Sequence, residues 1–310
     1  MKCPIISIVI PVYNEEKDIG GLLDSLMKLD YPKKKTEIIV IDDGSTDETP
    51  KIISKYPVKT IRGKHEGASV ARNLGWKSAK SDIIVFLDAD MRVHKNFLKE
   101  IMKSFHNKSV GGGYYIESFL NQKSLIAKLS YLRKIPAYAT RQLTLAKIAR
   151  KKALTQISGI KPHYGYYDDW EMAEKIKERG YDIICVPKAK MWHHEPETFS
   201  ELYRQQKWAG KSTLSLVKHK RVLRTIGFTF LCALLPLYLL LLFFRYPYYF
   251  FGILGLLTFS IIEIQRSFRM YFATKWKESF LTPFFDYVTM VFLAIGIFYG
   301  LLHIKSKPKV

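Results

Sequence analysis

The sequence has few cysteines and a deficit of acidic residues, and both shortages exclude classes of protein. Its 310 residues include three cysteines, Cys3, Cys185 and Cys232, which are far apart and form no CxxC pair. This pattern excludes a disulfide framework and a cysteine-based metal site. Lysine and arginine outnumber aspartate and glutamate by 49 to 28, so the formal charge is +21. We therefore expect an anionic partner: nucleic acid, a membrane surface or a phosphorylated substrate.

Two glycine-rich phosphate-binding motifs are also missing. No GxGxxG follows the first strand-like segment, and no GxxxxGK[ST] occurs anywhere. These absences disfavour a dinucleotide oxidoreductase and a P-loop NTPase. The basic residues are dispersed or flank apolar segments, and no nucleic-acid recognition motif accompanies them. We therefore expect no nucleic-acid partner.

Strand-like and helix-like segments alternate in the first two thirds of the chain. Strands are predicted at 5–14, 37–47, 58–63 and 82–90, with helices at 15–29, from about 48, and at 67–79. This order predicts an α/β fold with a mostly parallel sheet flanked by helices. Ligands of such sheets bind at the carboxyl ends of the strands.

Acidic residues follow two of the predicted strands at that edge. Asp42 and Asp43 end one strand, and Asp88 and Asp90 end another. If the strand continues to Asp90, the side chains of Asp88 and Asp90 lie on the same face and repel each other. A divalent cation between these carboxylates and the phosphates of a substrate would offset the repulsion, so we expect a Mg²⁺ or Mn²⁺ site.

Four motifs, "SIVIPVYNEE", "IDDGSTDET", "GASVARNLG" and "DIIVFLDAD", resemble in order and spacing the nucleotide-diphospho-sugar domain of family 2 inverting glycosyltransferases. The resemblance covers roughly residues 5–212 and implies the GT-A fold. It implies a nucleotide-sugar site formed by Pro11, Tyr13, Glu15, Asp43, Arg72 and Asp88.

The resemblance also implies a role for each of these positions. Pro11, Tyr13 and Glu15 border the nucleotide base, Asp43 hydrogen-bonds it, and Arg72 lines the nucleotide site. Asp88 and Asp90 form a DxD motif, in which Asp88 contacts ribose and metal and Asp90 binds the metal. An alternative for Asp42, Asp43 and Asp47 is turn and capping chemistry, which favours aspartate at such positions.

Two later stretches resemble further parts of the family pattern. "GYYDDWEMAEKIKERGY" (165–181) resembles the ED motif, with Asp168 in place of glutamate and Asp169 as the catalytic base. The alternative for Asp169 is an N-cap of the helix that follows. "CVPKAKMWHHEP" ends in two histidines, and the resemblance implies that one completes the metal site, with His193 the better match than His194.

"RQQKWAGKS" (204–212) resembles the Q-x-x-R-W motif of processive synthases, with Arg204 and Lys207 substituted and Trp208 kept. The resemblance implies that Arg204, Lys207, Trp208 and Asp168 contact the acceptor or the diphosphate, although the two substitutions weaken the inference to a processive enzyme. The alternative is an amphipathic helix on anionic membrane lipids.

Long apolar runs are confined to the end of the chain, at 225–244, 246–262 and 283–303. A helix of 20 uncharged residues is about 30 Å long, which matches a bilayer core. Basic residues at 218–224 and 266–277 should face the cytoplasm. We expect a multi-pass protein of the cell membrane with its catalytic domain on the cytoplasmic side. The third segment either crosses or re-enters, since the basic tail would otherwise end outside.

These observations divide the chain into a catalytic domain (1–198), an interfacial basic and aromatic region (199–224), a membrane domain with about three helices (225–303) and a basic tail (304–310). They predict a membrane-anchored, hexosyltransferase-like enzyme that transfers a sugar from a UDP- or GDP-linked donor to a hydroxyl of a lipid-linked or cell-surface glycan. One alternative is a polyprenyl (dolichyl) phosphate sugar synthase, although a phosphate acceptor is already ionised and scarcely needs a base. The other is a non-catalytic nucleotide-sugar-binding subunit of a glycan assembly complex.

Overall fold

The computed structural model describes residues 4–135, 145–161, 167–213, 248–274 and 276–303. The chain forms two compact units. The first comprises Met1–Leu120 and Gln142–His194, and the second comprises Asn121–Arg141 and Glu195–Val310. The segment Asn121–Arg141 thus joins the second unit from the middle of the sequence.

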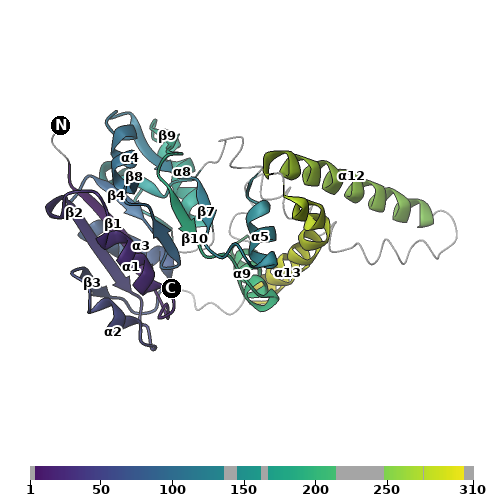
Figure 1. The fold of residues 1–310 in the computed structure, drawn as a ribbon, viewed down its shortest axis with the longest axis horizontal. Helices are drawn as coiled ribbons and strands as arrows, with labels where there is room; N and C mark the ends of the chain where they lie inside the picture. Colours follow the sequence, from purple (N-terminus) through teal and green to yellow (C-terminus); the bar gives the residue numbers. More distant parts are fainter. Residues whose placement is uncertain (1–3, 136–144, 162–166, 214–247, 275, 304–310) are drawn as a thin grey trace. The chain divides into compact units, whose positions relative to one another are not determined.

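The first unit is built on a seven-stranded sheet with the order β3-β2-β1-β4-β8-β6-β9 (Figure 1). Its strands are β1 (Ile6–Val12), β2 (Thr36–Asp42), β3 (Lys59–Arg62), β4 (Ile83–Phe86), β6 (Val110–Tyr114), β8 (Ile148–Arg150) and β9 (Asp182–Cys185). Strands β1 to β4 run parallel, whereas β8 is antiparallel to both of its neighbours. The predicted α/β fold with a mostly parallel sheet is confirmed.

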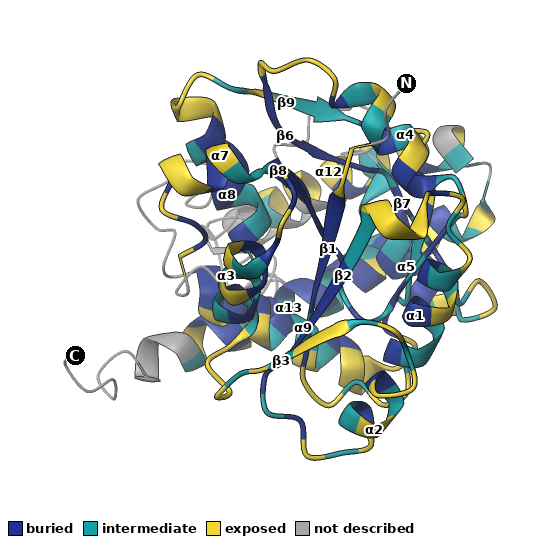
Figure 2. Ribbon diagram, turned by 90° about the vertical axis from the view of Figure 1, so that its left-hand side faces the viewer, coloured by how far each residue is buried: buried dark blue, intermediate teal, exposed yellow. Residues whose placement is uncertain are grey.

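Helices cover both faces of this sheet, and the strands are therefore apolar on both faces. In β1, Ile8 and Ile10 join one core, and Val9 between them joins the other. The first core includes residues of α1 (Ile19–Met27), α2 (Thr49–Ile53) and α4 (Phe97–Ser104). The second includes residues of α3 (Ala68–Ser78), α7 (Lys151–Gln156) and α8 (Asp168–Glu178). Figure 2 shows β1 buried and β3 more exposed at the edge.

A three-stranded sheet of order β5-β10-β7 completes the first unit. Its strands are β5 (Met91–Val93), β7 (Glu117–Phe119) and β10 (Met191–His193), and a short 3-10 helix, η1 (Lys33–Lys35), precedes β2. The antiparallel register places His193 opposite Met91. This pairing brings a histidine from late in the chain next to the end of the DxD motif.

The fourth predicted strand is shorter than expected, so the argument that Asp88 and Asp90 lie on the same face of a strand does not hold. Strand β4 ends at Phe86, because the chain turns to enter β5, with the Met91 N–H donating to the Asp88 carbonyl at 3.1 Å. Asp88 and Asp90 therefore lie in a turn and not on one face of a strand, so their side chains are free to take different directions.

The second unit consists of helices: α5 (Leu125–Leu132), α9 (Phe199–Thr213), α12 (Tyr248–Thr274), the 3-10 helix η4 (Lys277–Leu281) and α13 (Thr282–His303). Helices α9 and α13 approach closely at Gly210 and Gly296, where an added Cβ would lie 2.5 Å and 2.7 Å from backbone oxygens of the facing helix. Asp286 of α13 is 1% exposed and forms ion pairs with Arg133 at 2.5 Å and Arg266 at 2.9 Å.

In the part of the chain that the structure describes, one helical stretch, Lys277–Tyr299, is long and apolar enough to cross a membrane, with a mean hydropathy of 1.8. Its length and composition also fit a buried helix of a soluble protein, and 44% of its apolar window is buried. The predicted span at 225–244 lies outside the described residues.

The apolar segment 246–262, predicted to span the membrane, is part of a longer helix. Helix α12 continues to Thr274, because no proline or glycine follows Gly255 within it. Arg266 and Arg269 therefore belong to this helix and not to the connection that follows it.

The contact between α3 and β1 predicts a large effect of a single methyl group. An added Cβ at Gly75 would lie 2.3 Å from Cγ1 of the buried Val9, whereas at Gly20 of α1 the nearest atom would be 3.5 Å away. We expect Gly75→Ala to lower the free energy of unfolding by about 1–3 kcal/mol. The control Gly20→Ala should leave it unchanged or raise it by up to about 1 kcal/mol. Denaturant unfolding of both variants tests this, and equal stabilities would contradict the close packing.

Candidate active site

The candidate site lies at the carboxyl ends of β1, β2 and β4. Val12 at the end of β1 pairs with Asp42 at the end of β2, and the Asp43 N–H donates to the Val12 carbonyl at 2.8 Å. The Leu87 N–H after β4 donates to the Val9 carbonyl at 3.1 Å. The loops that carry the predicted nucleotide-sugar residues therefore leave neighbouring strands at one edge of the sheet.

Two aromatic rings stack at this edge. Tyr13 follows β1 and is exposed, and its ring centroid lies 4.1 Å from that of His65 at an interplanar angle of 34°. His65 was not predicted; its φ of 57° marks a tight loop before α3, which the sequence does not reveal. Pro11 lies within β1 opposite Ile41.

The acids after β2 organise the loops around them. The Asp42 carboxylate accepts from the Ser45 N–H at 2.8 Å, and Asp43 accepts from the N–H groups of Glu66 and Gly67 at 3.1 and 2.7 Å. The Asp47 carboxylate accepts from two backbone N–H groups, those of Glu16 and Thr49. All three aspartates therefore stabilise loops by accepting hydrogen bonds from backbone N–H groups. Any contact of Asp43 with a nucleotide base stays a prediction.

Arg72 of α3 connects two acids of the site. Its guanidinium lies 2.6 Å from Asp88 Oδ1 and 2.6 Å from Asp168 Oδ2, and Ser69 Oγ also donates to Asp168. Burial alone would raise the pKa of Asp88, but the charges of Arg72 and Lys147 outweigh burial and hold that pKa at about 2. The structure thus brings together three of the predicted residues, Arg72, Asp88 and Asp168.

Lys147 supplies a second cation that sequence reasoning missed. Its Nζ lies 3.7 Å from Asp88 Oδ2 and 3.2 Å from Glu117 Oε1. No local signal identifies Lys147 or Glu117, because three strands far apart in the sequence bring them to Asp88. Two protein cations therefore contribute to balancing the charge of Asp88, beside any divalent cation.

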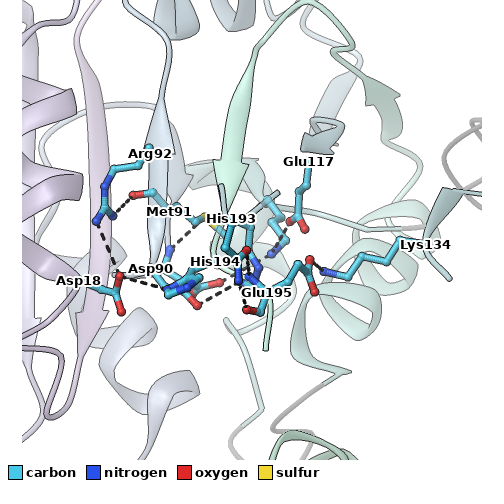
Figure 3. Close-up of polar contacts among 12 residues, drawn as sticks. Asp18, Asp90, Met91, Arg92, Glu117, Lys134, His193, His194 and Glu195 are labelled. Atoms are coloured by element: carbon cyan, nitrogen blue, oxygen red, sulfur yellow. Dashed lines mark hydrogen bonds and ion pairs between the residues drawn. The ribbon is translucent and has the colours of Figure 1, made fainter. Parts of the chain in front are cut away.

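Asp90 has a different environment from Asp88. Asp90 Oδ2 lies 3.2 Å from His193 Nε2, and its buried Oδ1 has no hydrogen-bond partner among the described residues (Figure 3). His194 lies next to Asp18, 3.6 Å from its carboxylate. Burial, followed by the charges of Asp90, Asp18 and Asp88, raises the pKa of Glu15 to about 8.

This excess of negative charge and the unpartnered carboxylate oxygen fit a divalent cation held through oxygen and nitrogen ligands. Among the predicted metal ligands, the contacts of Asp90 and His193 support this interpretation. Within the described residues, no group of three or more His, Cys, Asp or Glu side chains is arranged to hold a metal, and Asp88 contacts Arg72 and Lys147. Two protein ligands leave room for substrate oxygens, as in sites that use phosphates as ligands.

Asp169 is the second residue of α8, and Tyr167 occupies the N-cap position, so Asp169 is not the N-cap of the helix. Burial, followed by the charge of Asp168, raises the pKa of Asp169 to about 6 against the opposing charges of Lys147 and Arg72. Its carboxylate accepts from the Trp170 N–H at 2.7 Å. A partly buried carboxylate with a raised pKa has the properties of a general base.

Three predicted residues belong to the second unit. Arg204, Lys207 and Trp208 belong to α9 in the second unit, where the Lys207 ammonium lies 4.1 Å from the centre of the Tyr299 ring. Their contact with an acceptor or a diphosphate stays a prediction.

Comparison with known proteins identifies the family. Residues 7–150 match the family described as "Glycosyl transferase family 2", and residues 147–301, half of the chain, match "Glycosyl transferase family group 2". The chain belongs to the family 2 glycosyltransferases.

Relatives in Staphylococcus aureus share parts of this glycosyltransferase. It is 29% identical over 261 residues to a poly-beta-1,6-N-acetyl-D-glucosamine synthase, covering 76% of this chain and 60% of the relative. It is 38% identical over 100 residues to the poly(ribitol-phosphate) beta-N-acetylglucosaminyltransferase TarS, covering 30% of this chain and 18% of the relative. The chain therefore spans less than two thirds of the length of these relatives.

Solved structures support the GT-A-like fold of the glycosyltransferase. The mannosyltransferase PcManGT of Pyrobaculum calidifontis, in complex with GDP-Man and Mn²⁺, has a TM-score of 0.67 at 17% identity and covers 97% of this chain and 88% of its own. A crystal structure of S. aureus TarS 1–349 has a TM-score of 0.51 at 23% identity and covers 68% of this chain and 65% of its own.

The two ion pairs of Arg72 predict its contribution to stability. Arg72→Met leaves Asp88 and Asp168 without their guanidinium partner and should cost about 3–5 kcal/mol, toward the low end because Asp88 is partly exposed. The control Arg62→Met removes a solvent-exposed cation 3.7 Å from Asp42 and should cost less than about 1 kcal/mol. Denaturant unfolding measures both values, and a neutral Arg72→Met would show that the bridge is not formed in solution.

Proposed function

We propose that this glycosyltransferase is inverting and transfers a sugar from a UDP- or GDP-linked donor to a hydroxyl group of a lipid-linked or cell-surface glycan. The observation that carries this proposal is the half-buried Asp169, with a pKa of about 6, whose charged neighbours Arg72 and Lys147 also contact Asp88 of the DxD motif. A candidate base for the acceptor and a candidate acid for the donor thus share the same two cationic neighbours.

Several groups at the edge of the sheet suit the donor. The Tyr13–His65 stack offers an aromatic surface for a nucleotide base, with Pro11, Glu15 and Asp43 beside it. Solved structures of relatives contain UDP-GlcNAc, UDP or GDP-Man. Arg72 and Asp88 would face the ribose and the diphosphate. We infer that a nucleotide-sugar binds here.

Asp90 and His193, with Asp88 as a further candidate, would hold a divalent cation, Mg²⁺ or Mn²⁺. A histidine ligand suits Mn²⁺ as well as Mg²⁺, and the PcManGT complex contains Mn²⁺. When bound, the cation would neutralise the negative charge that develops on the leaving nucleoside diphosphate.

In this mechanism Asp169 is the general base that activates the acceptor hydroxyl. The acceptor oxygen attacks the anomeric carbon from the face opposite the diphosphate, so a new C–O bond forms as the bond to the diphosphate breaks. Asp169 takes the proton of the attacking hydroxyl. With a pKa of about 6, the Asp169 carboxylate is ionised at neutral pH and is a stronger base than an ordinary aspartate.

The acceptor is proposed to lie at a membrane. Large apolar side chains are exposed on α12 and α13, among them Phe272, Phe284 and Phe298, and exposed apolar patches mark lipid or protein contacts. Together with the candidate span Lys277–Tyr299, they support membrane association. That the protein is multi-pass, with its catalytic unit in the cytoplasm, is part of the proposal and rests on the apolar and basic segments of the sequence. In this arrangement α9, with Arg204, Lys207 and Trp208, would lie near lipid headgroups and the acceptor.

The donor side is tested with purified protein, Mn²⁺ and a panel of UDP- and GDP-sugars. We expect slow hydrolysis of one donor, and its loss in excess EDTA. Asp90→Asn should abolish this hydrolysis and the metal-dependent part of nucleotide binding while the melting temperature is kept. Full activity in EDTA or in Asp90→Asn would refute the metal role, and inertness toward every donor would favour a non-catalytic binding subunit.

Asp169→Asn tests the base. It keeps the shape of the side chain, so stability and nucleotide affinity should barely change, whereas loss of a general base lowers the transfer rate by about 10²–10⁴. The wild-type rate should rise with pH through about 6, because the pKa of Asp169 is raised to about 6 and only the deprotonated carboxylate accepts a proton.

The same variant separates the two acceptor classes. A rate within a few-fold of wild type would remove Asp169 as the base and favour polyprenyl phosphate, which is already ionised. A large fall in both melting temperature and nucleotide affinity would show instead that Asp169 is structural.

A further inference from the structure

Lys147 is a partly buried cation to which the proposed mechanism gives no role. Its side chain is 18% exposed, and its ammonium group lies 3.2 Å from Glu117 and 3.7 Å from Asp88. Such a charge is costly to bury, and a lysine in this position needs acidic partners to remain protonated. Its pKa is raised, because Glu117 and Asp88 outweigh the effect of burial, so Lys147 stays charged at neutral pH.

The backbone fixes the position of Lys147 between donor and acceptor acids. Its N–H donates to the Gly113 carbonyl of β6 at 2.9 Å, and its carbonyl accepts from the Phe86 N–H of β4 at 2.8 Å. The preceding residue, Ala146, donates its N–H to the Asp169 carbonyl at 3.0 Å. One short segment is therefore tied both to the strand that leads to Asp88 and to the helix turn that carries Asp169.

The groups around Asp169 have opposing effects on its charge. Lys147 and Arg72 favour its ionised form, whereas Asp168 and Glu117 oppose ionisation. Tyr115 stays neutral, because burial raises its pKa, and its hydroxyl donates to the Phe86 carbonyl at 3.0 Å. Glu117 therefore acts on Asp169 in the opposite direction to Lys147, although the two side chains form one ion pair.

We propose that Lys147 is a positioning residue of the transfer site: held by Glu117, its ammonium group fixes the Asp88 carboxylate for the donor and keeps Asp169 ionised for the acceptor. This proposal rests on the proposed function of Asp169 and Asp88. Arg72 holds the other oxygen of Asp88, and Lys147 is a second cation that acts on both the donor acid and the base.

The test uses two variants with opposite expected effects on the pH dependence of transfer. Lys147→Met removes the charge that favours ionised Asp169, so the pH of half-maximal rate should move upward by about one unit. Glu117→Gln removes a charge that opposes ionisation, so this pH should move downward. Lys147→Met should also weaken UDP or GDP binding by about tenfold, because a misplaced Asp88 no longer meets the donor.

Two further variants serve as controls. Lys147→Arg keeps the charge and should retain the wild-type pH profile. Lys151→Met removes a lysine from the same segment whose ammonium donates to the Ala79 carbonyl and not to the site, and it should change neither the pH profile nor the nucleotide affinity. Melting temperatures of all variants identify any that fail to fold.

Shifts of the pH profile in opposite directions would support the proposal, since a purely structural lysine has no reason to produce them. An unchanged profile and unchanged nucleotide affinity in folded Lys147→Met would overturn it while leaving the glycosyltransferase function intact. If Lys147→Met does not fold, an unshifted profile in Glu117→Gln overturns it. If wild-type protein transfers no sugar, the proposed function fails, and unchanged UDP and GDP affinities in Lys147→Met then overturn the role at Asp88.

Discussion

The arrangement of the site depends on how one carboxylate, that of Asp88, is neutralised. Asp88 follows β4 at the edge of a buried sheet, where an ionised acid is costly unless cations contact it. Arg72 from α3 takes one oxygen and Lys147 takes the other. Helix α3 brings Arg72 to Asp88 only because Gly75 allows the helix to pack directly on Val9 of β1. Packing at one glycine therefore determines which cation neutralises Asp88.

The two acids of the DxD motif differ in how their charges are balanced. Asp88 is balanced by protein cations, and its pKa is held at about 2. Near Asp90, burial, followed by the charges of Asp90, Asp18 and Asp88, raises the pKa of Glu15 to about 8. The need for an added cation is therefore greatest beside Asp90 and His193, and the pairing of β5 with β10 is what brings that histidine there.

Local patterns allowed much of the fold to be predicted, whereas contacts between distant strands did not follow from them. The alternation of apolar strand-like segments with helix-like segments predicted β1 to β4, and the motif acids at their ends lie at one edge. The end of β4 at Phe86 was not predictable, because an apolar run does not show where pairing stops. Lys147 and Glu117 also escaped prediction, since β8 and β7 bring them to Asp88 from far along the chain. Helix α12 was predicted too short because hydrophobicity ends at Glu263 while helical geometry continues.

The two adjacent acids of the ED-like motif divide their roles through helix geometry. Consecutive residues of an α-helix point about 100° apart, so Asp168 and Asp169 at the start of α8 cannot both face α3. Asp168 takes the Arg72 ion pair and the Ser69 hydroxyl. Asp169 accepts from a backbone N–H and has its pKa raised to about 6. Because Asp168 forms the ion pair with Arg72, the carboxylate of Asp169 remains available for proton transfer. The shorter aspartate at position 168 is sufficient, because Arg72 reaches it at 2.6 Å.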